Sequence, residues 1–574
     1  MPSSSPAQKR WLALLAPVMS CLAALASWVE VVRLGLFKRF SIDEFQYAHA
    51  AWLVSHGKLP YRDFFEFHFP LSYLSYAPFI TDDPTSIGHL RLFMLVVFAL
   101  TSFGIYRINR ELGPALALTG PIALATTTPF TFFATEIRPD AVAFGLFVFA
   151  LSLLFPAPVP PRRALALGAL WLLALFATQK AIIYTAPLGL LLVIDAIRAR
   201  SPFNARLLEV FRPLLLGAGG VALVIALYFL FTRSGTAWLQ QTLIWARYHE
   251  QHYPGFPWTR YAAPAFESAK LFCVLGGLGV LQTVLALKRS PAPLARPELA
   301  LLLLLASSLY SYGFARAPFP YALVPGLGML AVFVPRGLGF VFEWLGGTEL
   351  PRPVHFAGVG LILLAAAWLG PRVGFAESER KLTPNNAYQY RVLADLARLT
   401  KASDPVYDDS GSYVSRPNVG FRFYTSALDR NEEATTLPMT VEREVREVGC
   451  TALLLDARFH GLPPPLQRFF AQHYQPYSAD ILLWGQRFSP ARSTSTFEAV
   501  RDADYFVEPE TIATGDGFKI DGNEIHAAVF HLNHGMHQIE YSGGAREFWI
   551  SWLPADGQRY RPHYGLRPEF SSVF

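Results

Sequence analysis

Cysteine is scarce in this chain. The 574 residues contain only Cys21, Cys273 and Cys450, and the first two lie inside long apolar runs. A disulfide framework of the kind that staples small secreted domains is therefore excluded. This holds even for the C-terminal tail, which the topology argued below places in an oxidising compartment.

Several motifs of soluble enzymes are also missing. The sequence has no P-loop, no dinucleotide fingerprint in a strand–turn–helix context and no nucleophile elbow, which excludes nucleotide-powered transport and serine hydrolysis. The four histidines at positions 526–537 are not spaced like metal ligands: His526, His531, His534 and His537. We predict no cofactor, and the motifs leave a divalent metal open.

Long apolar runs are what the chain has in abundance. Hydrophobic residues make up 52% of it. Many runs approach the roughly 20 residues that cross a bilayer, which predicts a polytopic membrane protein with about eleven spans. We expect these spans at 11–34, 87–106, 115–131, 139–156, 164–179, 181–197, 213–232, 264–287, 298–312, 319–335 and 354–370.

The net charge of +6 comes from basic residues in the short loops between spans and does not indicate a nucleic-acid-binding surface. No nucleic-acid partner is therefore predicted. Basic residues occupy alternate short connections: Lys9/Arg10, Arg107/Arg110, Arg162/Arg163, Arg198 to Arg212, Lys288/Arg289 and Arg336/Arg352. By the positive-inside rule the N-terminus is cytoplasmic. The first loop and the tail after residue 370 are then extracytoplasmic. The first apolar segment resembles a signal peptide, but later loops need it as an uncleaved anchor for a consistent topology.

The first outer loop, residues 37–86, concentrates titratable groups. Asp43 and Glu44 follow the first span directly, and Asp63, Glu66 and His68 come soon after. Acidic groups beside a bilayer usually have a functional or pairing reason. Ser41 and Glu44 form a capping-box pattern that begins a helix, which we expect to lie on the membrane surface as an amphipathic element.

The tail predicts two extracytoplasmic modules. Residues 371–494 alternate helical stretches with short strands, as in an α/β domain. Residues 495–574 have strand-like runs and two glycine-centred hairpin signals, Asp521-Gly522 and His534-Gly535, as in a small β-sandwich.

The loop also carries ordered motifs: Asp43-Glu44, Gly57, Pro60-Tyr61 and Pro70-Leu71-Ser72-Tyr73. Weaker motifs follow as Glu136-Ile-Arg138-Pro-Asp140, Thr178-Gln179-Lys180 and Pro320-Tyr321. Together they resemble GT-C glycosyltransferases, in particular the branch of protein mannosyltransferases and lipid A aminoarabinose transferases. The resemblance covers roughly 1–370 and implies a GT-C transmembrane domain. Two positions depart from it: His68-Phe69 stands where relatives have a lysine, and Pro320 where many have arginine.

The resemblance implies a role for each candidate residue. It implies that Asp43 is the general base and that Glu44 supports it or binds the sugar. The donor phosphate is bound by cations, for which His68, Arg138, Lys180 and Arg316 are the candidates. Substrate contacts are expected from Tyr61, Asp63, Glu66, Glu136 and Asp140. A lipid phosphate is already a good leaving group, so the chemistry needs a base and positive charge rather than an acid.

Structural alternatives exist for several candidates. His68 fits an ordinary interfacial histidine. Asp43 and Glu44 fit a helix N-terminus, whose dipole favours negative charge. Lys180 fits a cation that extends from a span end towards water. Glu136, Arg138 and Asp140 fit an interfacial ion cluster.

The expected function is transfer of one sugar from a polyprenyl-phosphate donor to a glycan, lipid or protein acceptor, at the outer face of a bacterial inner membrane. One rival is a glycan ligase or oligosaccharyl transferase with a lipid-diphosphate donor. Another is a non-catalytic transporter of lipid-linked sugars. Transporters carry polar groups deep inside spans, whereas here the ionisable groups cluster at the outer ends.

Overall fold

The computed structural model describes residues 6–156, 159–198, 211–252, 255–289, 297–345, 385–423, 436–489, 494–515, 517–543, 546–565 and 570. The chain forms two compact units. The helical unit comprises Met1–Lys38, Phe67–Ser75 and Arg91–Pro384. The mixed unit comprises Arg39–Glu66, Tyr76–Leu90 and Asn385–Phe574. The first outer loop is therefore divided between the units, and most of it belongs with the C-terminal region.

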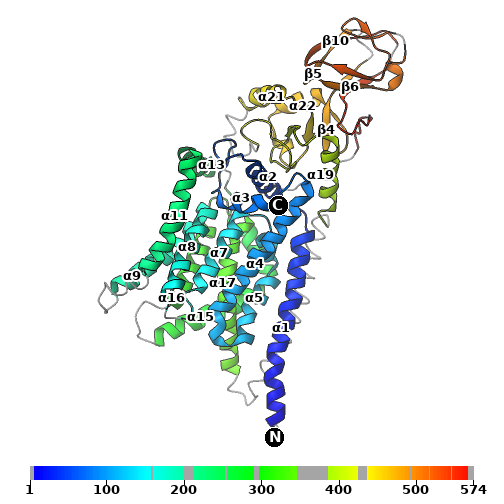
Figure 1. The fold of residues 1–574 in the computed structure, drawn as a ribbon. Coiled ribbons are helices and arrows are strands. Elements are labelled where there is room, and N and C mark those ends of the chain that lie inside the picture. The colour runs from blue at the N-terminus through cyan, green and yellow to red at the C-terminus, as the bar shows by residue number, and fades with distance from the viewer. Residues whose placement is uncertain are drawn as a thin grey trace. The chain divides into compact units, whose positions relative to one another are not determined.

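The helical unit is a bundle of apolar helices (Figure 1). Its long helices are α1 (Pro6–Phe37), α4 (Ile87–Asn109), α5 (Pro114–Thr126), α7 (Pro139–Ser152), α8 (Pro161–Ala177), α9 (Ile182–Arg198), α11 (Arg212–Thr232), α15 (Lys270–Arg289), α16 (Pro297–Phe314) and α17 (Val324–Leu345). Shorter helices connect them: α3 (Leu71–Tyr76), α6 (Thr128–Ala134), α12 (Gly235–Leu239), α13 (Ala246–His252) and α14 (Thr259–Ser268).

Small residues let neighbouring helices of the bundle approach closely. A Cβ atom added to Gly168 of α8 would lie 2.0 Å from the carbonyl oxygen of Leu214, and one added to Gly217 of α11 would lie 1.9 Å from that of Leu165. The two helices thus touch backbone to backbone at reciprocal glycines. Such contacts are how helices associate in lipid, where hydrophobic burial gives no advantage.

Five described helices are long and apolar enough to cross a membrane: Val18–Phe37, Pro84–Leu112, Arg212–Thr232, Lys270–Lys288 and Pro320–Trp344. They coincide with five predicted spans. The span predicted at 115–131 is not one straight helix, because the chain bends by 76° between α5 and α6. The segments predicted at 139–156 and 298–312 are shorter apolar helices. The span predicted at 354–370 lies outside the described residues, so the total of eleven stays a prediction.

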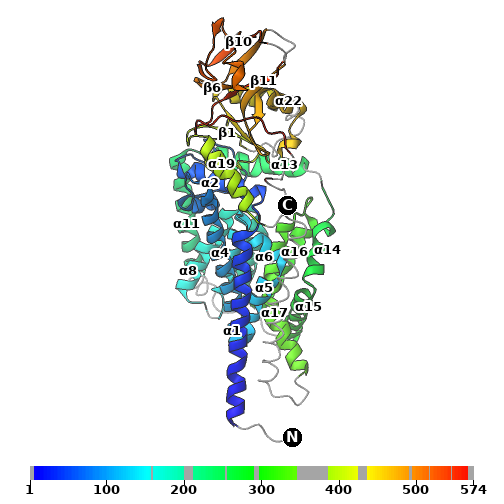
Figure 2. The ribbon, with the colours of Figure 1, turned by 90° about the vertical axis from the view of Figure 1, so that its right-hand side faces the viewer.

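The mixed unit contains helices α2 (Ile42–Ser55), α19 (Ala387–Leu399), α21 (Leu437–Glu447) and α22 (Pro464–His473). One sheet runs in the order β1 (Val406–Tyr407), β2 (Ala452–Leu454), β4 (Ile481–Phe488), β11 (Phe548–Trp552), β6 (Ala503–Glu508) and β9 (Val529–Leu532), and β3 (Tyr474–Pro476) pairs with β4. A second sheet has the order β5 (Thr494–Ala499), β10 (Gly535–Tyr541), β7 (Phe518–Ile520) and β8 (Asn523–Glu524). Strands β6, β10 and β11 are visible in Figure 2.

Aromatic rings fill the space between the two sheets. Phe548 of β11 stacks on Phe488 of β4 at 4.9 Å between centroids and meets Phe518 of β7 at 5.8 Å. The sequence predicts a boundary between two modules at residues 494 and 495. Strands from both sides of this boundary belong to the first sheet, because β11 pairs with β4. That division of the tail stays a prediction.

One of the two predicted hairpins is confirmed. Asp521 and Gly522 have φ angles of +51° and +80° and join β7 to β8 with Ile520 opposite Asn523. Positive φ at both turn positions is the geometry that two-residue hairpins require. The hairpin predicted at His534-Gly535 is wrong, since β9 pairs with β6 whereas β10 pairs with β5 and β7. The chain changes sheets there.

Helix α2 begins after Ser41 as predicted, but it is not an amphipathic surface helix. Every residue from Glu44 to Leu53 is buried, on all sides of the helix. Its polar residues have protein partners: the His49 ring bonds the carbonyl oxygen of Val414 at 2.8 Å and packs edge-on against Tyr413 and Phe423. The helix is therefore an internal element of the mixed unit.

Candidate active site

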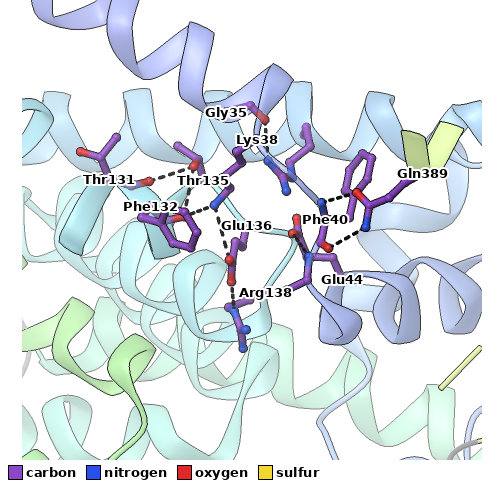
Figure 3. Close-up of polar contacts among 12 residues, drawn as sticks. Gly35, Lys38, Phe40, Glu44, Thr131, Phe132, Thr135, Glu136, Arg138 and Gln389 are labelled. Atoms are coloured by element: carbon purple, nitrogen blue, oxygen red, sulfur yellow. Dashed lines mark hydrogen bonds and ion pairs between the residues drawn. The ribbon is translucent and has the colours of Figure 1, made fainter. Parts of the chain in front are cut away.

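The two adjacent carboxylates at the start of α2 have different surroundings. Glu44 is fully buried, and its carboxylate accepts the backbone N–H of Ser41 at 2.9 Å (Figure 3). Asp43 remains 16% exposed, and its Oδ1 lies 3.2 Å from Nη2 of Arg458. Glu44 therefore closes the helix N-terminus, as the capping pattern predicts. Asp43 keeps some access to solvent and is the stronger candidate for chemistry.

The segment before Asp43 is held from a distant part of the sequence. The amide of Gln389 on α19 accepts the N–H of Phe40 at 2.8 Å and donates to its carbonyl oxygen at 3.0 Å (Figure 3). Gln389 is fully buried. This two-bond clamp fixes the backbone that delivers Asp43.

A second group of charges lies in the helical unit, at the end of α1. Nζ of Lys38 donates to the carbonyl oxygen of Phe132 and lies 3.5 Å from Oε1 of Glu136 (Figure 3). The other oxygen of Glu136 accepts from Nε of Arg138. All three charged side chains are at most 5% exposed. A buried charge that loses its partner destabilises the protein strongly. Each charged side chain of this network is therefore held in place by the next one.

Tyr321 links this network to the turn that carries Lys180. The guanidinium carbon of Arg138 lies 4.3 Å from the centre of the Tyr321 ring, and Nζ of Lys180 lies 5.0 Å from it. Lys180 also lies 3.5 Å from Oδ2 of Asp140. We call Lys38, Glu136, Arg138, Asp140, Lys180 and Tyr321 the cation cluster. Its three cations and two carboxylates leave one net positive charge, which suits an anionic ligand.

The other predicted phosphate ligands are placed differently. Arg316 is exposed and donates to the carbonyl oxygen of Gln251, while its own carbonyl accepts the N–H of Phe256 at 3.1 Å. It therefore supports the connection between α13 and α14. His68 is half-buried, and the adjoining carbonyl of Phe67 accepts from Gln179, the neighbour of Lys180, at 3.1 Å.

Predicted substrate contacts in the first loop shape a turn of the mixed unit. Tyr61 has a φ of +70° and donates its N–H to Phe64 at 2.8 Å. The Asp63 carboxylate accepts the N–H of Leu59 at 2.8 Å, and the Arg62 guanidinium lowers the pKa of Asp63 through a direct hydrogen bond. Glu66 is fully buried. Substrate contact by these residues stays a prediction.

Within the described part of the chain, no group of three or more His, Cys, Asp or Glu side chains is arranged to hold a metal ion. Two of the C-terminal histidines pair with carboxylates instead: Nδ1 of His531 lies 3.0 Å from Asp504, and Nδ1 of His537 lies 2.7 Å from Asp521. The first pair joins β9 to β6, and the second joins β10 to the turn between β7 and β8.

No protein-family model and no curated protein sequence matches this chain. Solved structures do. ArnT from Cupriavidus metallidurans bound to undecaprenyl phosphate superposes with a TM-score of 0.55 at 14% identity, over 82% of this chain and 97% of that one. Its apo form superposes with a TM-score of 0.55 at 15% identity, over 83% and 98%. The apo Archaeoglobus fulgidus oligosaccharyltransferase follows with a TM-score of 0.50 at 12% identity, over 84% and 75%.

The protein has the GT-C fold. The GT-C fold that the first-loop motifs imply is therefore confirmed, and so is the C-terminal module with β-sheets that the tail predicts. At these identities the likeness concerns the fold alone. The functional site of this chain must therefore be inferred from the residues of this chain.

Sequence reasoning missed three residues. Lys38 is the first of two adjacent basic residues at the end of the first span, and Tyr321 lies in one of the weaker motifs, which gave no role to its ring. Arg458 follows strand β2 by four residues and is one of many arginines in the tail. Only Lys38 had a usable signal, namely a charge at a membrane boundary directly before the acidic pair.

Proposed function

We propose that this GT-C protein is a membrane glycosyltransferase that moves one sugar from a polyprenyl-phosphate donor to an envelope acceptor on the extracytoplasmic face. Asp43 is the general base. The acceptor is a glycan, a lipid or a protein that presents a hydroxyl group. The fold neighbour bound to undecaprenyl phosphate makes a donor of this chemical class the natural first choice.

The reaction needs only two kinds of group. Asp43 takes the proton of the acceptor hydroxyl as its oxygen bonds to the anomeric carbon of the sugar. The bond from that carbon to the phosphate oxygen breaks, and its electron pair leaves with the polyprenyl phosphate. Arg138 and Lys180 stabilise the charge that grows on that phosphate. Direct displacement of this kind inverts the anomeric carbon.

The observation that carries this proposal is the cation cluster. Two cations share the ring of Tyr321, and each also pairs with a carboxylate of the same cluster. The side chains are thus oriented before any ligand arrives, which is what electrostatic catalysis requires. The net positive charge matches a departing phosphate better than a neutral sugar.

The test compares cells that lack the protein with cells that produce the wild-type, Asp43→Asn or Asp83→Asn form. Masses of glycolipids and envelope glycans are measured in each. Asp83 is a matched control, because it lies in the same loop and only caps a short helix by accepting the N–H of Thr85. Asparagine caps equally well, so Asp83→Asn should behave as wild type.

The expected result is a product that lacks the mass of one sugar in the deletion and Asp43→Asn cells alone. Loss of a well-placed base costs on the order of 10²–10⁴ in rate. Normal product in Asp43→Asn cells would refute Asp43 as the base. Loss of a complete glycan chain would instead identify a ligase with a lipid-diphosphate donor. If the product masses are unchanged but the lipid-linked sugar accumulates on the other face of the membrane, the protein would be a transporter.

A further inference from the structure

Asp43 lies at the carboxyl edge of the parallel strands of the mixed unit. Strands β1 and β2 run parallel, with Val406 opposite Ala452. The loops that follow them therefore leave the sheet at the same edge. The loop after β2 contains Arg458, whose Nη2 lies 3.2 Å from Asp43 and whose Nη1 lies 3.4 Å from the hydroxyl of Ser410 in the loop after β1.

Two buried carboxylates fix these loops. Oδ1 of Asp456 accepts the backbone N–H groups of Arg458 and Phe459, each at 2.9 Å. The Asp408 carboxylate accepts the N–H groups of Ser410, Gly411 and Ser412 at 2.9, 2.6 and 2.6 Å. Both aspartates are 2% exposed. The backbone of Arg458 and the backbone of Ser410, whose hydroxyl bonds Arg458, are thus both fixed by buried carboxylates, and they orient the Arg458 side chain towards Asp43.

We propose that Arg458 is a positioning residue for Asp43: its guanidinium holds the carboxylate in one orientation and keeps it ionised to receive the acceptor proton. This inference rests on the proposed function. It assigns the C-terminal region a direct part in the chemistry through the ion pair between Arg458 and Asp43. A carboxylate that faces a cation is favoured in its charged form, and a fixed orientation keeps its oxygen aligned with the attacking hydroxyl.

The geometry gives Arg458 a role that a mere fold-stabilising ion pair lacks. Its side chain is 19% exposed and that of Asp43 is 16% exposed, so the pair is half-buried and reaches solvent rather than lying in the core. Its removal should therefore leave the mixed unit folded, with the backbone before Asp43 still held by the clamp from Gln389.

The experiment measures kcat, KM for the donor and the pH–rate profile of Arg458→Gln and Arg458→Lys, with the donor and acceptor identified by the glycan comparison. The matched control is Arg446→Gln. Arg446 lies on α21 of the same unit, and its Nε forms a 2.8 Å ion pair with Glu498. Thermal unfolding of each full-length variant in lipid nanodiscs reports whether it is folded.

Arg458→Gln should lower kcat by about 10²-fold, the scale of a small misplacement of a reacting group, while KM for the donor changes little. The acidic limb of its pH–rate profile should move to higher pH, because the carboxylate has lost its cation. Arg458→Lys keeps the charge, so its acidic limb should stay in place while kcat falls less. Arg446→Gln should change neither kcat nor the profile.

A double variant separates positioning from direct action on substrate. If Arg458 acts through Asp43, Arg458→Gln should have no further effect on kcat in an Asp43→Asn background. Multiplying effects would overturn the proposal, as would a rise in KM alone or a wild-type profile in folded Arg458→Gln. If Arg458→Gln does not fold, a wild-type kcat in Arg458→Lys overturns it. Normal activity of Asp43→Asn would instead refute the proposed function itself.

Discussion

Gly279 and Gly337 face each other across the contact between α15 and α17. A Cβ atom on either glycine would lie 2.9 Å from the backbone nitrogen of the other. One on Gly279 would also lie 1.9 Å from the carbonyl oxygen of Phe333. No residue larger than glycine fits there without moving a helix, so this pair sets the distance between the two helices.

Gly279→Ala should therefore destabilise the helical unit. Overpacking of a tight contact costs about 1–3 kcal/mol. Gly277→Ala on the same helix is the control, because among the described residues nothing lies within 4 Å of its added Cβ. Both changes bring the same gain in helix propensity. Thermal unfolding in nanodiscs should give a lower Tm for Gly279→Ala only, and equal Tm values would contradict the close packing.

Tyr321 should matter for the donor through its ring rather than its hydroxyl. Tyr321→Leu removes the surface on which Arg138 and Lys180 rest, an interaction of about 0.5–2 kcal/mol that corresponds to roughly two- to thirty-fold in affinity. KM for the donor should rise by that factor. Tyr321→Phe keeps the ring and should stay near wild type. Equal losses in both variants would mean that the hydroxyl is the important group.

His49 should make the mixed unit sensitive to acid. Burial lowers the pKa of His49 to about 4, although its hydrogen bond to the Val414 carbonyl opposes the shift. In the unfolded chain the ring of His49 is protonated near pH 6.5, whereas in the folded chain it stays neutral down to about pH 4. The free energy of unfolding therefore keeps its full value above pH 6.5 and falls by about 3 kcal/mol in total as the pH drops towards 4. The difference in Tm between wild type and His49→Gln, measured from pH 7.5 to 4, should shrink with acidification. A constant difference would refute this assignment.

The orientation of the chain can be read from cysteine labelling. Ser403 is exposed in the mixed unit, and Ser403→Cys should react with a membrane-impermeant thiol reagent once the outer membrane alone is opened. Native Cys450 should stay silent, because it is fully buried and burial raises the pKa of its thiol to about 11. The exposed Arg110 lies at the opposite face in the predicted topology, so Arg110→Cys should react only after the inner membrane is breached. The reverse pattern would invert the topology.

Local patterns in the sequence predicted local structure well. Apolar runs located the long helices, and the Ser41–Glu44 pattern located the start of α2. The Asp521-Gly522 turn was predicted because its geometry depends on two residues only. The His534-Gly535 prediction failed because a turn signal does not say to which sheet the next strand will bond.

The parts that the sequence did not reveal depend on contacts between distant segments. Four residues of the cation cluster lie in sequence motifs, so the sequence could indicate that they belong together: Glu136, Arg138, Asp140 and Lys180. The clamp between Phe40 and Gln389 and the ion pair between Asp43 and Arg458 join residues hundreds of positions apart. Nothing in the composition or spacing near either partner marks such a pair. Long-range pairing is decided by the packing of the whole unit.

Because the first loop is folded into the mixed unit, the order of synthesis separates the base from its surroundings. Residues 39–66 leave the ribosome early, whereas their partners Gln389, Val414 and Arg458 are made more than 300 residues later. The N-terminal helices can insert one after another, but in the predicted topology Asp43 acquires its fixed position only when the C-terminal region has crossed the membrane and packed on the loop. For the proposed enzyme, a chain that stalls during export would then be inactive, and activity would report that the mixed unit has assembled.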